Sequence, residues 1–132
     1  MTRTTNQRFG DWGEQMAKDF LCQRGYRFLA KNVRTPYGEI DLLMLDECEQ
    51  KHDGRQALVF VEVKTRSTDT FGYPEDAIGA RKREHMIAAA EFYLQEHPEY
   101  SERWRIDVVS IRVKERKGKP EIAHFEDAIG EW

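Results

Sequence analysis

The chain has 132 residues, of which 34% are charged and 39% are hydrophobic, and its formal net charge is -3. This length favours a single domain, spanning residues 1–132, that can bury a sizeable core. The composition excludes a disordered polar chain, and the negative net charge argues against nonspecific binding of nucleic acid through overall charge. Any contact with phosphate must therefore come from a local patch of basic residues.

The cysteines and the start of the chain bear on its compartment. Cys22 and Cys48 have no paired spacing, so no disulfide framework is indicated and a reducing compartment is expected. A structural zinc site is not expected, because Cys48 and His52 lack the second recognisable pair of ligands that such a site requires. The first residues are polar, and no apolar window approaches the length of a membrane span. These features predict a cytoplasmic protein with no membrane partner.

The first predicted element is a helix over residues 9–24. Its apolar residues recur at helical spacing, and Gly25 is well placed to end it. Glu14 falls at the margin of the apolar stripe, beside the small residues Gly10 and Ala17. It is either an ordinary boundary glutamate in an early helical turn, where negative charge suits the helix dipole, or an acid that the helix contributes to a neighbouring site.

Two strands follow, over residues 26–32 and 39–45, with a turn between them. The period of two in the second strand places Glu39 and Asp41 on one side. The apolar residues that point to the other side are Ile40, Leu42 and Met44. The loop over 46–56 is polar. Its acids are expected to be solvated and to have no catalytic role: Asp46, Glu47, Glu49 and Asp53.

A third predicted strand, over 59–66, carries an acid and a base on one face. Its valines alternate with other residues, which places Phe60, Glu62 and Lys64 together on the opposite side. The Cα atoms of Glu62 and Lys64 are then roughly 6.6 Å apart. If this strand pairs with the preceding one as a hairpin, Asp41, Glu62 and Lys64 can converge.

Two carboxylates and an ammonium group in this position have two interpretations. Asp41 and Glu62 could hold a hard divalent cation, with Lys64 beside it for phosphate or water, as in metal-assisted phosphodiester hydrolysis. Alternatively, Glu62 and Lys64 form a same-face ion pair on a solvated strand. The apolar flanks of the strand favour the first interpretation, because charges embedded there need partners or a metal to offset desolvation.

The second half of the chain adds a basic cluster. A loop over 67–74 contains Phe71 and Tyr73, which either stack on bases or cap the core. A helix is predicted over 75–95. Three consecutive cations near its start could position a phosphate, although charge clusters on helices usually face water. Together with the cation that ends the preceding strand, they are the candidate nucleic-acid-binding residues: Arg66, Arg81, Lys82 and Arg83.

Two further strands are predicted, over residues 104–113 and 122–125. In the first of them, Ile106 and Val108 alternate with a side on which Asp107 lies among apolar residues. Asp107 is either a paired acid at the edge of the core or an outer group of the site. The order of helix, three strands, helix and two strands predicts an α/β layered domain with a mixed sheet.

Several segments keep their order along nearly the whole chain and together resemble one family. They are Gly10-x-x-Gly13-Glu14 with Ala17 and Leu21, Gly25-Tyr26, Asn32-x-Arg34, Gly38-Glu39-Ile40-Asp41, Phe60-Val61-Glu62-Val63-Lys64-x-Arg66, Gly72 with Pro74, Glu75 and Ala77, Lys82, Ala90 with Leu94, and Arg105-x-Asp107-Val108-Val109. This set resembles the YraN-like uncharacterised proteins, which are placed in the restriction-endonuclease-like nuclease superfamily and likened to Holliday junction resolvases. Ile106 stands where the family leads us to expect phenylalanine, a change in packing that leaves the site untouched.

The resemblance implies a restriction-endonuclease-like three-layer domain with a central mixed β-sheet flanked by helices. It also implies that Asp41 and Glu62 are metal ligands, that Lys64 is the catalytic lysine, and that Glu14 is an additional acid. The implied activity is that of a Mg²⁺- or Mn²⁺-dependent nuclease acting on DNA, including branched DNA, and a homodimer would suit a symmetric junction. The alternatives are a noncatalytic module that binds nucleic acid or protein, and a structural adaptor with paired charges.

Overall fold

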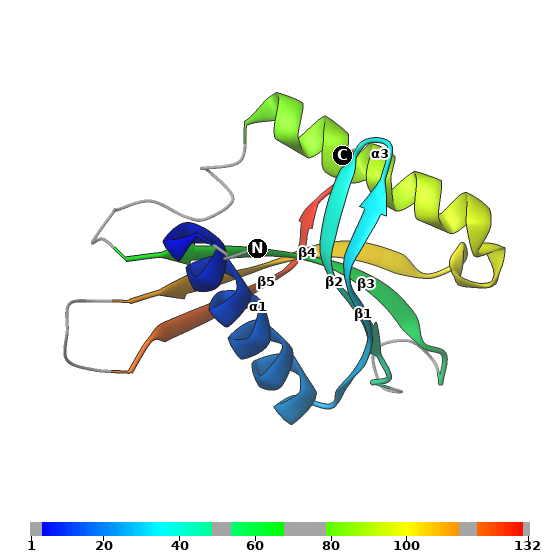
Figure 1. Cartoon of the computed structure of the whole chain (residues 1–132). Helices are drawn as coiled ribbons and strands as arrows, with labels where there is room; N and C mark the ends of the chain where they lie inside the picture. The colour runs from blue at the N-terminus through cyan, green and yellow to red at the C-terminus, as the bar shows by residue number, and fades with distance from the viewer. Residues whose placement is uncertain (1–3, 49–53, 68–78, 114–118, 131–132) are drawn as a thin grey trace.

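The computed structural model describes residues 4–48, 54–67, 79–113 and 119–130 (Figure 1). Within these ranges the helices and strands follow the order predicted from the sequence. The elements are α1 (Thr5–Gln23), β1 (Tyr26–Thr35), β2 (Gly38–Asp46), β3 (Ala57–Arg66), α3 (Ala80–Glu96), the 3-10 helix η2 (Pro98–Tyr100), β4 (Trp104–Arg112) and β5 (Glu121–Ile129). The aromatic residues Phe71 and Tyr73, and the predicted start of the second helix over 75–78, lie outside the described residues.

The strands form a mixed sheet in the order β1-β2-β3-β4-β5, with β3 in the middle. Neighbouring strands are antiparallel, except that β3 and β4 are parallel. Parallel neighbours need a long crossover connection, and α3 lies in the connection between β3 and β4. The mixed sheet predicted from the sequence is therefore confirmed.

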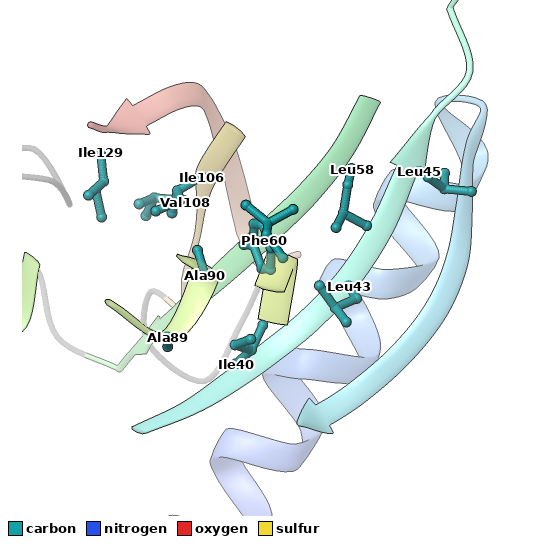
Figure 2. Close-up of a cluster of buried hydrophobic side chains, with 11 residues drawn as sticks. Ile40, Leu43, Leu45, Leu58, Phe60, Ala89, Ala90, Ile106, Val108 and Ile129 are labelled. Carbon is teal, nitrogen blue, oxygen red and sulfur yellow. The ribbon is translucent and has the colours of Figure 1, made fainter. Parts of the chain in front are cut away.

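The helices α1 and α3 cover opposite faces of this sheet (Figure 1). The buried apolar residues between α3 and the sheet (Figure 2) are Ile40, Leu43, Leu45, Leu58, Phe60, Ala89, Ala90, Leu94, Ile106, Val108 and Ile129. Those between α1 and the sheet are Ala17, Leu21, Tyr26, Leu42, Met44, Val59, Val61, Val109 and Ile111. A central sheet with an apolar layer on each face confirms the three-layer, restriction-endonuclease-like fold class that the sequence predicted.

Helix α1 begins at Thr5, earlier than the predicted start at residue 9, because a capping box precedes it. The amide of Gln7 donates to the Thr4 hydroxyl oxygen at 3.1 Å, and the Thr4 amide donates to Gln7 Oε1 at 2.8 Å. This reciprocal pair satisfies two backbone donors, and its Thr-x-x-Gln pattern is visible in the sequence. Gly25 follows the helix as predicted, with a φ of 91° that favours glycine.

The side chains of β2 divide between the two apolar layers. Leu42 and Met44 pack under α1 and Leu43 packs under α3, as a period of two requires. Ile40 also packs under α3 (Figure 2), so the prediction that it shares a side with Leu42 and Met44 is wrong. On the N-terminal side of Leu42, β2 pairs with β1 alone. The hairpin that β1 and β2 form twists toward α3. This twist carries Ile40 into the other layer.

A network of buried charges lies on the α1 side of the sheet. Asp107 is fully buried, accepts a hydrogen bond from Arg105 Nε at 2.9 Å, and lies 2.7 Å from His124 Nε2. His124 in turn packs edge-on against Phe20 of α1. Arg105 also pairs with Asp46 at 3.0 Å, and Asp46 is 3% exposed, so the expectation that Asp46 is a solvated loop acid is wrong. Asp107 is the paired core acid of the two alternatives that the sequence left open.

Helix α3 turns its apolar side to the sheet, as the sequence predicted. The described residues of that side are Met86, Ala89, Ala90, Tyr93 and Leu94. The alanines among them let the helix lie close to β2, and Tyr93 meets Phe60 edge-on at a ring-centroid distance of 5.8 Å. Neither α1 nor α3 combines the length and the apolar character that crossing a membrane would require, and no other described helix does so.

Gly13 marks the close approach of α1 to the sheet. It is buried, and a Cβ atom at this position would collide with the side-chain oxygen of Thr65 on β3. At Gly10, on the preceding turn of α1, no described atom lies within 4 Å of the corresponding position. The missing side chain of Gly13 therefore lets α1 lie directly against the C-terminal half of β3. This close approach also brings the next residue, Glu14, near that part of β3.

We expect Gly13→Ala to destabilise the protein and Gly10→Ala to stabilise it. Alanine favours a helix over glycine by about 1 kcal/mol, and nothing around Gly10 opposes this gain. At Gly13 the added methyl group overpacks against Thr65, and changes of this kind cost about 1–3 kcal/mol. Urea unfolding of the parent and both variants measures the difference. Equal stabilisation by the two substitutions would contradict the close approach of α1 to β3.

Candidate functional site

Glu62 and Lys64 lie toward the C-terminal end of β3, on the face covered by α3. Phe60 packs under α3, and the period of two places the next two alternate side chains on that face, as predicted. Lys64 Nζ lies 3.5 Å from Glu62 Oε1, and the side chains of Lys64 and Glu62 are 27% and 8% exposed. The two residues therefore form an ion pair, but a largely buried one and not one on a solvated strand face.

Asp41 meets Glu62 at the point where β2 separates from β3. Backbone pairing between the two strands ends at Leu42 and Val61. Beyond this point, the amide of Val63 donates to Asp41 Oδ2 at 2.9 Å. The side chain of Asp41 thus supplies the acceptor that a continued ladder would have supplied. Its carboxyl group also interacts electrostatically with that of Glu62, on the neighbouring strand. The two predicted acids are brought together by the pairing of their strands, as the hairpin hypothesis required.

Burial and the neighbouring Glu62 perturb the carboxyl group of Asp41. Burial raises the pKa of Asp41 to about 8, and the negative charge of Glu62 adds to the shift. The hydrogen bond from Val63 lowers the pKa of Asp41, but this effect is the smaller one. At neutral pH and without a bound cation, Asp41 therefore keeps its proton for most of the time. A divalent cation could take the place of this proton, because it would neutralise both acids at once.

Glu14 is the third acid of this region. Burial raises its pKa, and the charges of Asp11 and Glu39 raise it further. The explanation of Glu14 as a residue of an early helical turn does not apply, because α1 begins at Thr5 and the dipole effect fades within the first turn. The charge of Glu14 also raises the pKa of Asp41. Glu14 thus acts electrostatically on the acid pair from α1, on the face of the sheet opposite to α3.

Asn32 belongs to this region as well, although sequence reasoning assigned it no role. Its Nδ2 donates to Glu14 Oε1 at 3.2 Å. Its φ is 52°, in the left-handed region that asparagine adopts more readily than most non-glycine residues. An asparagine at the end of a predicted strand was the available signal. The local backbone at Asn32 turns its amide group toward α1 and holds the Glu14 carboxyl group in place.

Of the four candidate nucleic-acid-binding cations, one lies at the acid pair. Lys82 is in the first turn of α3, and its Nζ lies 3.6 Å from Glu62 Oε1. Arg66 continues the same face of β3 toward its end and is half-buried. Arg81 is exposed and Arg83 is half-buried. The structure therefore brings Lys82 into the site as a second cation beside Glu62, and leaves Arg81 at the surface.

The acid pair has the ligand chemistry of a site for a hard cation. Asp41 and Glu62 offer the carboxylate oxygens that Mg²⁺ and Mn²⁺ prefer. Among the described residues, no three His, Cys, Asp or Glu side chains are grouped closely enough to hold a metal ion. Two carboxylates are nevertheless a usual protein contribution to Mg²⁺ binding, because this ion keeps several waters and takes further ligands from phosphates. The pair fits a cation whose coordination is completed by water and a substrate.

The three-layer fold and the buried acid pair beside a strand lysine define an α/β domain of the restriction-endonuclease-like class. The model of the Uncharacterised protein family UPF0102 matches residues 13–111, which include all three acids of the site. A UPF0102 protein of Syntrophomonas wolfei is 41% identical over 94% of this chain and 99% of its own length. Another, from Mycolicibacterium gilvum, is 42% identical over 96% of this chain and 98% of its own length. The chain belongs to the UPF0102 family, and the resemblance to the YraN-like proteins is confirmed.

We expect the metal-free protein to lose stability as the pH rises through neutrality, and Asp41→Asn to remove that loss. Asp41 binds its proton more tightly in the folded than in the unfolded chain, so its contribution to the free energy of unfolding is complete below about pH 4 and falls as the pH rises to about 8. One such proton gives a slope of at most about 1.4 kcal/mol per pH unit.

Urea unfolding in EDTA at several values between pH 5 and pH 8, on the parent and on Asp41→Asn, measures this slope. Asparagine is a matched replacement, because its amide oxygen can still accept the hydrogen bond from Val63. Parallel pH profiles in the two proteins would show that Asp41 carries no proton in this range.

Proposed function

We propose that the protein is a metal-dependent nuclease that hydrolyses phosphodiester bonds in DNA, with Mg²⁺ or Mn²⁺ as its cofactor and branched or otherwise structured DNA as its preferred substrate. The observation that carries this proposal is the adjacency of the Asp41 and Glu62 carboxyl groups, with Lys64 Nζ 3.5 Å from Glu62. Two buried acids side by side are unfavourable as a purely structural feature, because they cannot both ionise without repulsion. A bound divalent cation would turn this repulsion into attraction.

Each residue of the site has a distinct role in this proposal. Asp41 and Glu62 would hold the cation, which when bound polarises the scissile phosphate and lowers the pKa of a coordinated water. Lys64 orients the attacking water or neutralises the negative charge that develops on the phosphate. Glu14, whose pKa burial raises, is suited to accept a proton, and Asn32 orients it.

The choice of DNA follows from the resemblance to resolvase-like nucleases and from the charges around the site. A net charge of -3 does not attract nucleic acid, so the phosphate backbone must be bound by local cations. Lys64 and Arg66 lie on one face of β3, and Lys82 reaches that face from α3. A homodimer would present two such sites to a symmetric branched substrate.

A cleavage panel tests the proposal. Single-stranded, duplex, flap and four-way DNA, with RNA of the same sequences, are incubated with the protein in Mg²⁺, in Mn²⁺ and in EDTA. We expect cleavage of DNA that requires the metal and is fastest on the branched forms. Metal-independent binding of nucleic acid without cleavage would support a noncatalytic binding module instead. If the protein neither binds nor cleaves nucleic acid, only the structural-adaptor hypothesis remains.

Substitutions of Glu62 and Lys64 should have different effects, although the two residues share one strand face. Glu62→Gln removes a ligand charge, so both Mn²⁺ affinity and cleavage should be lost. Lys64→Ala leaves the carboxylates in place and should keep or improve Mn²⁺ binding, because a repelling cation is removed, while cleavage falls by about 100-fold or more. Isothermal titration with Mn²⁺ and the cleavage assay measure the two effects separately.

Glu102→Gln is a matched control for Glu62→Gln. Glu102 also forms an ion pair at 3.5 Å, with Arg55, but its side chain is 81% exposed. An exposed pair of this kind contributes little, so this substitution should change neither Mn²⁺ affinity nor cleavage. Indistinguishable Mn²⁺ affinities in the parent, Glu62→Gln and Lys64→Ala would contradict the assignment of Glu62 as a metal ligand.

A further inference from the structure

Lys64 and Lys82 share a single carboxylate oxygen. Their Nζ atoms lie 3.5 Å and 3.6 Å from Oε1 of Glu62. Both distances exceed the usual length of about 2.7–2.9 Å for a charged hydrogen bond between nitrogen and a carboxylate. Neither lysine therefore holds this oxygen tightly, and both stand close to any cation that Glu62 would bind.

The two lysines differ in how readily their side chains can move away from Glu62. The Lys64 side chain is 27% exposed and projects from the middle strand of the sheet. The Lys82 side chain is 49% exposed and projects from the first turn of α3. An ion pair with a half-exposed lysine is weak, and its long side chain can rotate into solvent with little loss of burial. Of the two cations, Lys82 is the exchangeable one.

The charges of the site favour an anionic partner for Lys82. When Asp41 and Glu62 act as ionised ligands, their charges are balanced by those of Lys64 and Lys82. A divalent cation added to this balanced set leaves two positive charges without compensation. A phosphodiester group supplies negative charge at the same place, so it relieves the repulsion between the cation and the lysines.

We propose that Lys82 is an exchangeable counterion, which pairs with Glu62 in the metal-free site and moves to a phosphate oxygen of the substrate when the cation binds. This inference rests on the proposed function and adds that the cation and the phosphodiester bind cooperatively. Lys82 repels the cation and weakens its binding when no phosphate is present. This repulsion is relieved when a phosphate oxygen pairs with Lys82. By linkage, DNA and cation then raise each other's affinity by the same factor. A lysine that only ties α3 to β3 would stay on Glu62 whether or not phosphate is present, so it would not couple the affinities for the cation and for DNA.

Titration with Mn²⁺ alone provides the first test. We expect Lys82→Met to bind Mn²⁺ about tenfold more tightly than the parent, because a repelling charge has been removed. Lys82→Arg keeps that charge and should match the parent. Lys18→Met is the matched control for net charge, since Lys18 projects from α1 with its Nζ 4.0 Å from the centre of the Phe28 ring. It should also match the parent. Thermal unfolding of each variant verifies that it is folded.

The second test repeats the titrations with a saturating phosphorothioate-backbone DNA oligonucleotide, which resists hydrolysis. DNA should raise the Mn²⁺ affinity of the parent by roughly tenfold, and Lys82→Met should lose most of this factor. If the parent binds Mn²⁺ and Lys82→Met binds it equally well, with and without DNA, the exchange is wrong and the proposed metal site stands. If none of the proteins binds Mn²⁺, the proposed metal site itself is wrong.

Discussion

The hydrogen bond from the Val63 amide to the Asp41 carboxyl group is the interaction on which the geometry of the site depends. A backbone amide within a partly buried sheet needs an acceptor, and β2 no longer provides one after Leu42 has paired with Val61. A side chain supplies it instead. This substitution places a carboxyl group between two strands, in the sheet itself, and brings it beside Glu62, which follows the last paired residue of β3.

The separation of β2 from β3 also gives both helices access to the same acids. Glu14 comes from α1 and Lys82 comes from α3, on opposite faces of the sheet (Figure 1). Yet the charge of Glu14 raises the pKa of Asp41, and Lys82 lies 3.6 Å from Glu62. A continuous sheet would have separated the α1 layer from the α3 layer at this point. The close approach of α1 at Gly13 completes this arrangement from its side.

Sequence reasoning succeeded where the information was local. The shared face of Glu62 and Lys64 follows from the pleat of a single strand, so the alternation alone was sufficient. It failed where the partner lies far along the chain. Ile40 changed layers because the whole hairpin twists, and Asp46 is buried because an arginine of β4 pairs with it. Lys82 could be recognised as a cation near a phosphate site, but its contact with Glu62 depends on the path of the crossover between β3 and β4.

The two sets of buried charges in this sheet differ in a way that bears on function. Asp107 pairs in register with Val61, the residue just before Glu62, and each of its oxygens has a close donor, with Arg105 supplying its charge partner. Buried charges compensated in this manner are compatible with a structural role. Asp41 and Glu62 have weaker compensation, from a retained proton and from lysines at 3.5 Å and 3.6 Å. The same sheet can therefore stabilise a buried acid fully, and it does not do so at this pair. An acid pair left partly uncompensated, in which the pKa of Asp41 is strongly raised, is better suited to receiving a charged ligand than to holding strands together.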